Sequence, residues 1–272
     1  MEKFAKNMET ENFLEWLKTV NLRHGGVHLC GSKGYGKSVA LKHIARFYAS
    51  QKSDTTVIIC DTILNWVQNF DRCQYYTVKE DAVEEISKSM EIHEDMGYLT
   101  WAKQYRIDSE PFEYLEDMLR RKRGLVLFNI ELQEIDLVGV FQAKLIDYLY
   151  QKQRIQKKYW KDKLQHQYII VSEETEAVFD TSILDRKIMN RTRKQYSEMA
   201  NLRIAMFSCS QRLTEVSLKF RGKMDSYLLA HTNLEDWDTR LTRILRFSKH
   251  RNEIPNLPIG TFLDTKTDIL VH

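Results

Sequence analysis

Proline and glycine are scarce in this chain. Only three prolines, Pro111, Pro255 and Pro258, and ten glycines occur among its 272 residues. Flexible linkers and low-complexity segments are rich in these two residues, and neither such a stretch nor an internal repeat is visible. The length is sufficient for one large α/β domain. We therefore expect a single continuous domain over residues 1–272.

Long apolar runs are also missing. No run approaches the roughly 20 apolar residues that a membrane-spanning helix needs, and the opening Met1-Glu2-Lys3-Phe4 does not begin a signal peptide. These observations argue against a membrane protein or a secreted one. They predict a soluble, intracellular protein.

Cysteine and net charge also exclude some classes of protein. The four cysteines, Cys30, Cys60, Cys73 and Cys209, lack metal-ligand spacing, and three of them lie in or beside predicted strands. We expect buried, reduced thiols. A net charge of +3 is too small to indicate nucleic-acid binding by the surface as a whole, so such binding requires local clusters of cations.

Three of the ten glycines fall within the eight residues 31–38, which read Gly-Ser-Lys-Gly-Tyr-Gly-Lys-Ser. They match the phosphate-binding pattern G-x-x-x-x-G-K-[ST] at every fixed position. An apolar strand-like run over 27–30 precedes them, and helically spaced apolar residues follow over 39–48. A plain glycine-rich turn would not require these flanking elements, so the pattern predicts a P-loop.

In a P-loop, backbone N–H groups at a helix N-terminus surround the phosphates, and glycine is needed where the backbone closes around them. We expect Lys37 to reach the β- and γ-phosphates of ATP, and the Ser38 hydroxyl to bind Mg²⁺. The predicted ATP-binding residues are Gly31, Ser32, Lys33, Gly34, Tyr35, Gly36, Lys37, Ser38 and Val39.

Two predicted strands end in acidic residues. The apolar run 168–171 leads through Ser172 to Glu173 and Glu174. In such a pair, one carboxylate can hold Mg²⁺ while its neighbour orients and deprotonates water. The strand pattern alone does not say which of the two acids has which role. The other strand ends at Asp61, which either faces a ligand at this sheet edge or caps the next turn.

A third strand, over 202–209, leads into Ser210, Gln211 and Arg212. Beside the two acids, the Gln211 amide could sense the γ-phosphate. The alternative is an ordinary turn glutamine.

The remaining segments predict the surroundings of this site. We expect a helix within an N-terminal preamble (1–24), a strand over 75–78, a helix over 81–93, a helical insertion over 94–123 and a strand over 124–130. Residues 231–272 should add a helix and edge strands. The predicted fold is an α/β P-loop NTPase of RecA/ASCE-like type, with a mainly parallel central sheet flanked by helices.

Cations cluster in two places. A helix over 137–150 continues as a polar segment over 151–163, which has six cations, one acid and the aromatic pair Tyr159 and Trp160. Interleaved basic and aromatic residues suit a phosphate backbone, while a solvated helix end is the alternative. The run Arg120 to Arg123 allows the same two interpretations.

Together the motifs resemble the FtsK/HerA superfamily of P-loop DNA-pumping ATPases, especially its compact archaeal and viral members, which include genome-packaging ATPases. The resemblance extends over about residues 25–230. It rests on residues 31–38 and on the strand segments 57–61, 169–174 and 207–212. The last two segments, in this order and spacing, are the more distinctive part.

The resemblance implies an ATPase that uses Mg²⁺ and translocates double-stranded DNA as a hexameric homo-oligomer, with capsid or portal proteins as partners. It implies a cytoplasmic location, in the host cytoplasm if the chain is viral. It assigns Lys37, Glu174 and Gln211 to catalysis.

Two features depart from the family pattern. The family usually has Asp where this chain has Glu173, so the resemblance assigns Glu173 to the Mg²⁺ and implies a metal shell that differs in detail from the usual one. The arginine that acts on the neighbouring subunit's ATP has no unambiguous counterpart. We select Arg193, with Arg191, Arg203 and Arg221 as the other candidates.

Two other functions fit the same motifs. One is an assembly or secretion ATPase of the filamentous-virus type, which acts on protein instead of DNA. The other is a non-motor nucleotide-dependent switch. This function would be favoured if Glu173, in place of the usual Asp, makes ATP hydrolysis slow. DNA binding that weakens with salt would separate the motor from both.

Overall fold

The computed structural model describes residues 12–22, 25–51, 54–61, 66, 74–79, 88–93, 98–106, 124–131, 135–159, 164, 166–173, 185–224, 226–233, 237 and 239–272. Its strands are β1 Gly26–Cys30, β2 Thr55–Asp61, β3 Gln74–Lys79, β4 Lys88–His93, β5 Tyr98–Arg106, β6 Gly124–Glu131, β7 Gln167–Ser172, β8 Ile204–Ser210, β9 Ser226–Leu229, β10 Phe262–Asp264 and β11 Ile269–Val271. Its helices are α2 Lys37–Gln51, α4 Ile135–Tyr159, α6 Arg186–Glu198, α7 Leu218–Arg221 and α8 Thr239–Ile244, with a further helix over 12–19.

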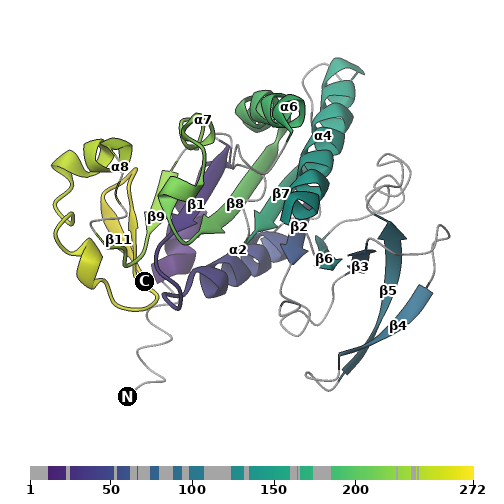
Figure 1. The fold of residues 1–272 in the computed structure, drawn as a ribbon, viewed down its shortest axis with the longest axis horizontal. Helices are drawn as coiled ribbons and strands as arrows, with labels where there is room; N and C mark the ends of the chain where they lie inside the picture. The colour runs from purple at the N-terminus through teal and green to yellow at the C-terminus, as the bar shows by residue number, and fades with distance from the viewer. Residues whose placement is uncertain are drawn as a thin grey trace.

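The strands form one sheet in the order β11-β10-β9-β1-β8-β7-β2-β6-β3-β5-β4 (Figure 1). The strands from β9 to β5 in this order pair in parallel. The outer strands β4, β10 and β11 pair antiparallel. A parallel sheet is covered on both faces, which explains why its strands are continuous apolar runs and not alternating ones. All seven residues of β2 are buried.

Helices cover both faces of the sheet. Leu41 of α2 lies in one buried cluster with Val57 of β2, while Phe141 of α4 lies in another with Ile58. Successive strand residues point to opposite faces, so α2 and α4 lie on opposite sides. Figure 1 shows the same arrangement, with α6 beside α4. The mainly parallel α/β fold expected from the sequence is confirmed.

The C-terminal hairpin is bound to the N-terminal helix by one buried carboxylate. Asp264, which is 3% exposed, accepts hydrogen bonds from the indole of Trp16 (3.0 Å), the Thr267 hydroxyl (2.8 Å) and the Lys266 backbone N–H (3.0 Å). The Ser226 hydroxyl of β9 donates to the same carboxylate. Both ends of the described chain therefore pack at the same edge of the sheet.

Two helix predictions are wrong where the structure describes the chain. Residues 88–93 of the helix expected over 81–93 form β4, and residues 98–106 of the expected helical insertion form β5. β4 and β5 make an antiparallel pair that extends the sheet beyond β3. The prediction relied on apolar residues four apart, such as Trp101 and Tyr105. That spacing places residues on one face of a strand as well as of a helix.

The other segments agree with expectation. The strands predicted over 75–78 and 124–130 are β3 and β6, and the C-terminal edge hairpin is β10 with β11. Cys30, Cys60 and Cys209 are buried thiols that form no disulfide among the described residues, and burial raises the pKa of Cys60 to about 12. Cys73 lies outside the described residues. In the described part of the chain, no helix is long and apolar enough to cross a membrane.

Candidate nucleotide site

The predicted P-loop lies between β1 and α2, at the carboxyl edge of the sheet. Residues 31–36 form the turn, and α2 begins at Lys37. The Ala40 N–H donates to the Gly36 carbonyl at 2.9 Å, which starts the helix. Gly36 has a φ of 89°, a conformation that residues with a Cβ rarely adopt. The local geometry is that of a loop that closes tightly onto a helix N-terminus.

The C-terminal part of the chain supports this loop. The Ser32 N–H donates to the His231 carbonyl at 2.8 Å. A Cβ on Gly31 would lie 2.7 Å from the Cβ of Ala230, and a Cβ on Gly36 would lie 3.3 Å from the Cα of Gly260. The tight packing explains the two loop glycines. Sequence reasoning missed these supporting residues because they lie some 200 positions away; a glycine at position 260 in a glycine-poor chain was the only signal.

The Lys37 side chain folds back over the loop. It is 9% exposed, and its ammonium donates to the carbonyls of Gly31 (2.6 Å) and Ser32 (2.9 Å). The positive charge is thus held above the loop whose N–H groups would receive the phosphates. Of the other predicted nucleotide ligands, Ser38 is half-buried and Val39 is 57% exposed. The Tyr35 ring contacts the His231 ring edge-on, with 4.3 Å between centroids.

Glu173 follows β7 directly and is 6% exposed. Neither carboxylate oxygen has a hydrogen-bond partner among the described residues. Val171, two residues earlier, packs in the cluster of α2, and the alternation of strand side chains directs Glu173 to that same face. A buried carboxylate without a partner is costly, so this position calls for a cation.

Magnesium fits this donor set. Mg²⁺ binds hard oxygen ligands and usually takes only one or two from the protein, with phosphate and water completing its shell. Ser38 and Glu173 are oxygen donors of the required kind. No group of three or more His, Cys, Asp or Glu suited to a metal occurs in the part of the chain that is described.

Gln211 lies at the same sheet edge. It follows Ser210, the last residue of β8, and β8 runs between β1 and β7. The Gln211 side chain is exposed. The backbone carbonyl of Gln211 is 3.8 Å from the Cys30 thiol at the end of β1. The fold thus brings the P-loop, Gln211 and Glu173 onto three neighbouring strands. Glu174, the predicted general base, lies outside the described residues.

The structure places Asp61 at the carboxyl edge of the sheet, and both interpretations, ligand and cap, stay predictions. It is fully buried at the end of β2. Its carboxylate accepts a hydrogen bond from the Trp66 backbone N–H at 3.0 Å. That bond joins the end of β2 to a residue five positions further along the chain.

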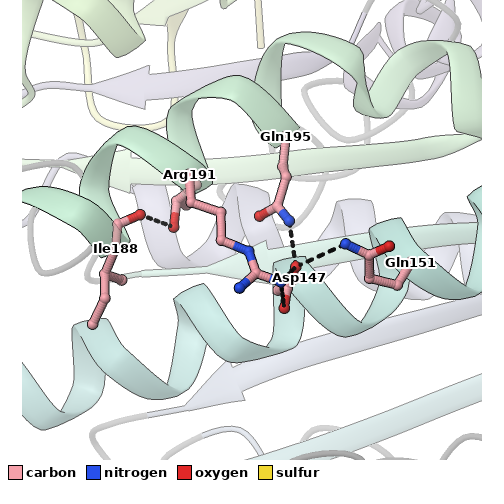
Figure 2. A network of polar contacts seen from close by, with 6 residues as sticks. Asp147, Gln151, Ile188, Arg191 and Gln195 are labelled. Atoms are coloured by element: carbon pink, nitrogen blue, oxygen red, sulfur yellow. Dashed lines mark hydrogen bonds and ion pairs between the residues drawn. The ribbon is translucent and has the colours of Figure 1, made fainter.

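Three of the four candidate arginines are engaged within the subunit. Arg191 donates to both carboxylate oxygens of Asp147 on α4, at 2.8 and 2.6 Å (Figure 2). Arg203 donates to the Leu164 carbonyl, and Arg221 is 4% exposed. Arg193 is half-buried on α6, and its side chain has no ion pair or hydrogen bond with other described residues. Its role toward a neighbouring subunit stays a prediction.

The described part of the basic segment, residues 151–159 at the end of α4, lies at the amino edge of the sheet, opposite the carboxyl edge that has the P-loop. α4 connects β6 to β7, which are both parallel to β2, so its C-terminal end lies at the amino edge, away from the P-loop. Lys157 and Lys158 are in its last turn. Tyr159, 74% exposed, lies 6.0 Å from the Lys158 ammonium. Residues 160–163 and the run 120–123 are outside the described residues.

Comparison with known proteins yields similarity of fold alone. No protein-family profile and no curated protein matches the sequence. The genome packaging NTPase B204 from Sulfolobus turreted icosahedral virus 2, in complex with sulfate, is similar with a TM-score of 0.52 and 11% identity over 90% of this chain and 94% of that chain. Its complex with ATP-gammaS gives a TM-score of 0.51 and 13% identity, over 90% and 94% of the two chains. At these identities the likeness shows the fold, and it confirms the P-loop NTPase fold predicted from the motifs.

Proposed function

We propose that this protein binds ATP with Mg²⁺ at the P-loop and hydrolyses it, and that hydrolysis drives the translocation of double-stranded DNA. The observation that carries the ATPase proposal is the pairing of the P-loop with Glu173. The buried, unpartnered Glu173 carboxylate lies on the same side of the sheet as α2, whose first residue is Lys37. A cationic phosphate ligand and an acidic cation ligand on one side of a sheet suit a magnesium nucleotide.

Each residue at the site has one proposed task. The loop N–H groups and the Lys37 ammonium bind the phosphates. To do so, Lys37 gives up its hydrogen bonds to the Gly31 and Ser32 carbonyls and forms new ones to phosphate oxygens. Ser38 and Glu173 hold Mg²⁺, which neutralises charge on the β- and γ-phosphates. Glu174 takes the proton from the attacking water. Gln211 donates its amide to the γ-phosphate, and Arg193 acts on the ATP of an adjacent subunit in a hexameric ring.

ATP hydrolysis by the purified protein tests the catalytic part of this proposal. Lys37→Ala removes the principal side-chain cation of the phosphate site. We expect turnover to be lost, while the far-UV circular dichroism and melting temperature stay near those of the wild type. Lys249→Ala is the matched control, because Lys249 is an exposed lysine near the C-terminus and is not part of the proposed nucleotide site. Equal turnover in Lys37→Ala and wild type would contradict the proposal.

Double-stranded DNA is the proposed cargo. The structural relative is by name a genome packaging NTPase, and this chain has a basic helix end at residues 154–159, where Arg154 and Lys158 are exposed and Lys157 is half-buried. We propose that this basic helix end contacts the phosphates of DNA without reading its bases. We also propose that capsid or portal proteins are partners of the complex of this protein with DNA. A cytoplasmic location, in the host if the chain is viral, accords with this role.

Salt titration of DNA binding tests the proposed contact. Replacing Lys157 and Lys158 with Gln should reduce the slope of log K against log[salt] by about 0.9 for each lost phosphate contact, equally for unrelated sequences. The double variant Lys249→Gln with Lys266→Gln removes the same charge from exposed positions near the C-terminus and should leave the slope unchanged. If both double variants had the same slope as the wild type, the DNA path would lie elsewhere.

A further inference from the structure

A histidine lies inside the strand that leads into the P-loop. His28 of β1 is 0% exposed, although it belongs to a run that the sequence marks as apolar. A buried imidazole is stable only when its polar atoms are hydrogen-bonded. Its Nδ1 lies 2.9 Å from the Ser208 hydroxyl, and its Nε2 lies 2.9 Å from the Ser210 hydroxyl. Both serines belong to β8, the strand that ends at Ser210, directly before Gln211.

The contacts of Ser210 fix the direction of these hydrogen bonds. The Ser210 hydroxyl donates to the Arg212 carbonyl at 2.9 Å. A hydroxyl has one hydrogen, so Ser210 must accept from His28, and Nε2 must carry the imidazole proton. The bare Nδ1 then accepts from Ser208. The bonds form a chain that runs from Ser208 through His28 and Ser210 to the backbone of Arg212.

The charge state of His28 agrees with this direction. Burial, together with the nearby charges of Arg221 and Lys37, lowers the pKa of His28 to about 3. The ring is therefore neutral at any physiological pH and keeps Nδ1 as an acceptor.

This chain of hydrogen bonds encloses Gln211. Ser210 precedes Gln211 and Arg212 follows it, so the bond from the Ser210 hydroxyl to the Arg212 carbonyl closes a short loop around the glutamine. His28 ties that loop to the P-loop strand two residues before Cys30, whose thiol lies 3.8 Å from the Gln211 carbonyl. Because the Gln211 side chain is itself exposed, its position depends on this backbone.

We propose that His28 and Ser210 are positioning residues that hold Gln211 in register with the P-loop, so that its amide meets the γ-phosphate. This inference rests on the proposed ATPase function and assigns residues that the P-loop and acidic-strand patterns do not include. Ser208 supplies an internal control. It is as buried as Ser210 and bonds the same imidazole, but its bond leads away from Gln211.

Steady-state ATP hydrolysis of the full chain tests the proposal. Ser210→Ala should lower kcat about tenfold and leave KM for ATP within about twofold, because misplacement of a group that acts in the transition state reduces the rate more than binding. Ser208→Ala should stay within about twofold of wild type in both. In a Gln211→Ala background, Ser210→Ala should cost nothing further, since the two residues act as one unit.

Other outcomes would overturn the proposal. If Ser208→Ala and Ser210→Ala had equal kcat, or if the losses of Ser210→Ala and Gln211→Ala were additive in the double variant, the hydrogen-bond chain would contribute only to packing. A wild type that does not hydrolyse ATP would overturn the proposed function and this inference with it.

A second measurement is independent of turnover. Nitrogen-15 NMR of labelled histidine, assigned with His28→Gln, should show His28 neutral with its proton on Nε2 between pH 5 and 8. A proton on Nδ1 would reverse the chain and overturn the inference alone, whatever the ATPase rate.

Discussion

At the scale of single residues, the site depends on two buried side chains, Glu173 and Lys37, that form no ion pair with other described residues. The Glu173 carboxylate has no hydrogen-bond partner among the described residues, and the Lys37 ammonium is bonded only to carbonyls of its own loop. Such charges are unfavourable in isolation. They are accounted for if a magnesium nucleotide joins them, because the cation then faces Glu173 and the phosphates face Lys37.

Substitutions at the two adjacent acids test which one holds the cation. Glu174→Gln should keep Mg²⁺-dependent ATP binding and slow hydrolysis by about 10² to 10⁴, the usual effect of removing a general base. Glu173→Ala should instead weaken the Mg²⁺-dependent part of ATP binding. Titration of a fluorescent ATP analogue, with Mg²⁺ and with EDTA, separates the two effects. If the two variants exchanged behaviours, the assignment would be off by one residue.

The sequence predicts residues of this site that belong to a contiguous pattern. The P-loop and the strand-ending Glu173 and Gln211 could be located in this way. His28, Ala230 and Gly260 could not be, because their roles arise from contacts between strands and loops that are distant in sequence. A histidine within an apolar run is informative only once its hydrogen-bond partners are known.

At the scale of elements, one carboxylate joins the two helices on the face opposite α2. Asp147 of α4 accepts from Arg191 and Gln195 of α6, and from Gln151 one turn along its own helix (Figure 2). The two helix partners differ in burial. Arg191 is exposed at the surface, whereas Gln195 is 4% exposed.

This difference in burial predicts unequal effects of two substitutions. Asp147→Ala should destabilise the protein by about 1–3 kcal/mol, because it leaves the buried Gln195 amide without its acceptor. Arg191→Ala removes only a solvent-exposed ion pair, worth about 0–1 kcal/mol. Urea denaturation monitored by circular dichroism measures both. A larger loss in Arg191→Ala than in Asp147→Ala would contradict the assignment of the buried amide.

Elements were predicted well where residue type and spacing agreed. The strands β2, β7 and β8 are continuous apolar runs, as fully buried parallel strands should be. The strands β4 and β5 were mistaken for helices because the four-residue spacing of Ile86 and Met90, or of Trp101 and Tyr105, does not distinguish the two periods. The aromatic content of residues 98–106 was a signal for a strand that this spacing obscured.

At the scale of the whole molecule, the order of strands assembles the site. Placing β8 between β1 and β7 brings the P-loop, Glu173 and Gln211 to one carboxyl edge, where open α/β sheets bind ligands, although 135 positions separate Ser38 from Glu173 in the sequence. The opposite edge receives the basic end of α4. The proposed nucleotide site and the proposed DNA contact therefore lie at opposite ends of the strands, so a motor would couple them through the strands and helices between.

The sequence could not predict how the C-terminal segment closes the site. Residues 231–272 were expected to add a helix and edge strands, and they do so as α8, β10 and β11. Their contacts with the P-loop, through His231 and Gly260, depend on the crossover that places β9 beside β1. Such a long-range pairing leaves no periodic signal in the sequence.

The most direct test of the motor proposal is the specific rate of ATP hydrolysis, measured over a range of protein concentrations with and without double-stranded DNA of two unrelated sequences. If Arg193 completes the ATP site of an adjacent subunit, as an arginine supplied in trans does, the specific rate should rise with protein concentration, and both DNAs should raise it equally. A specific rate that is constant from dilute to concentrated protein and indifferent to DNA would contradict the motor and favour a nucleotide-dependent switch.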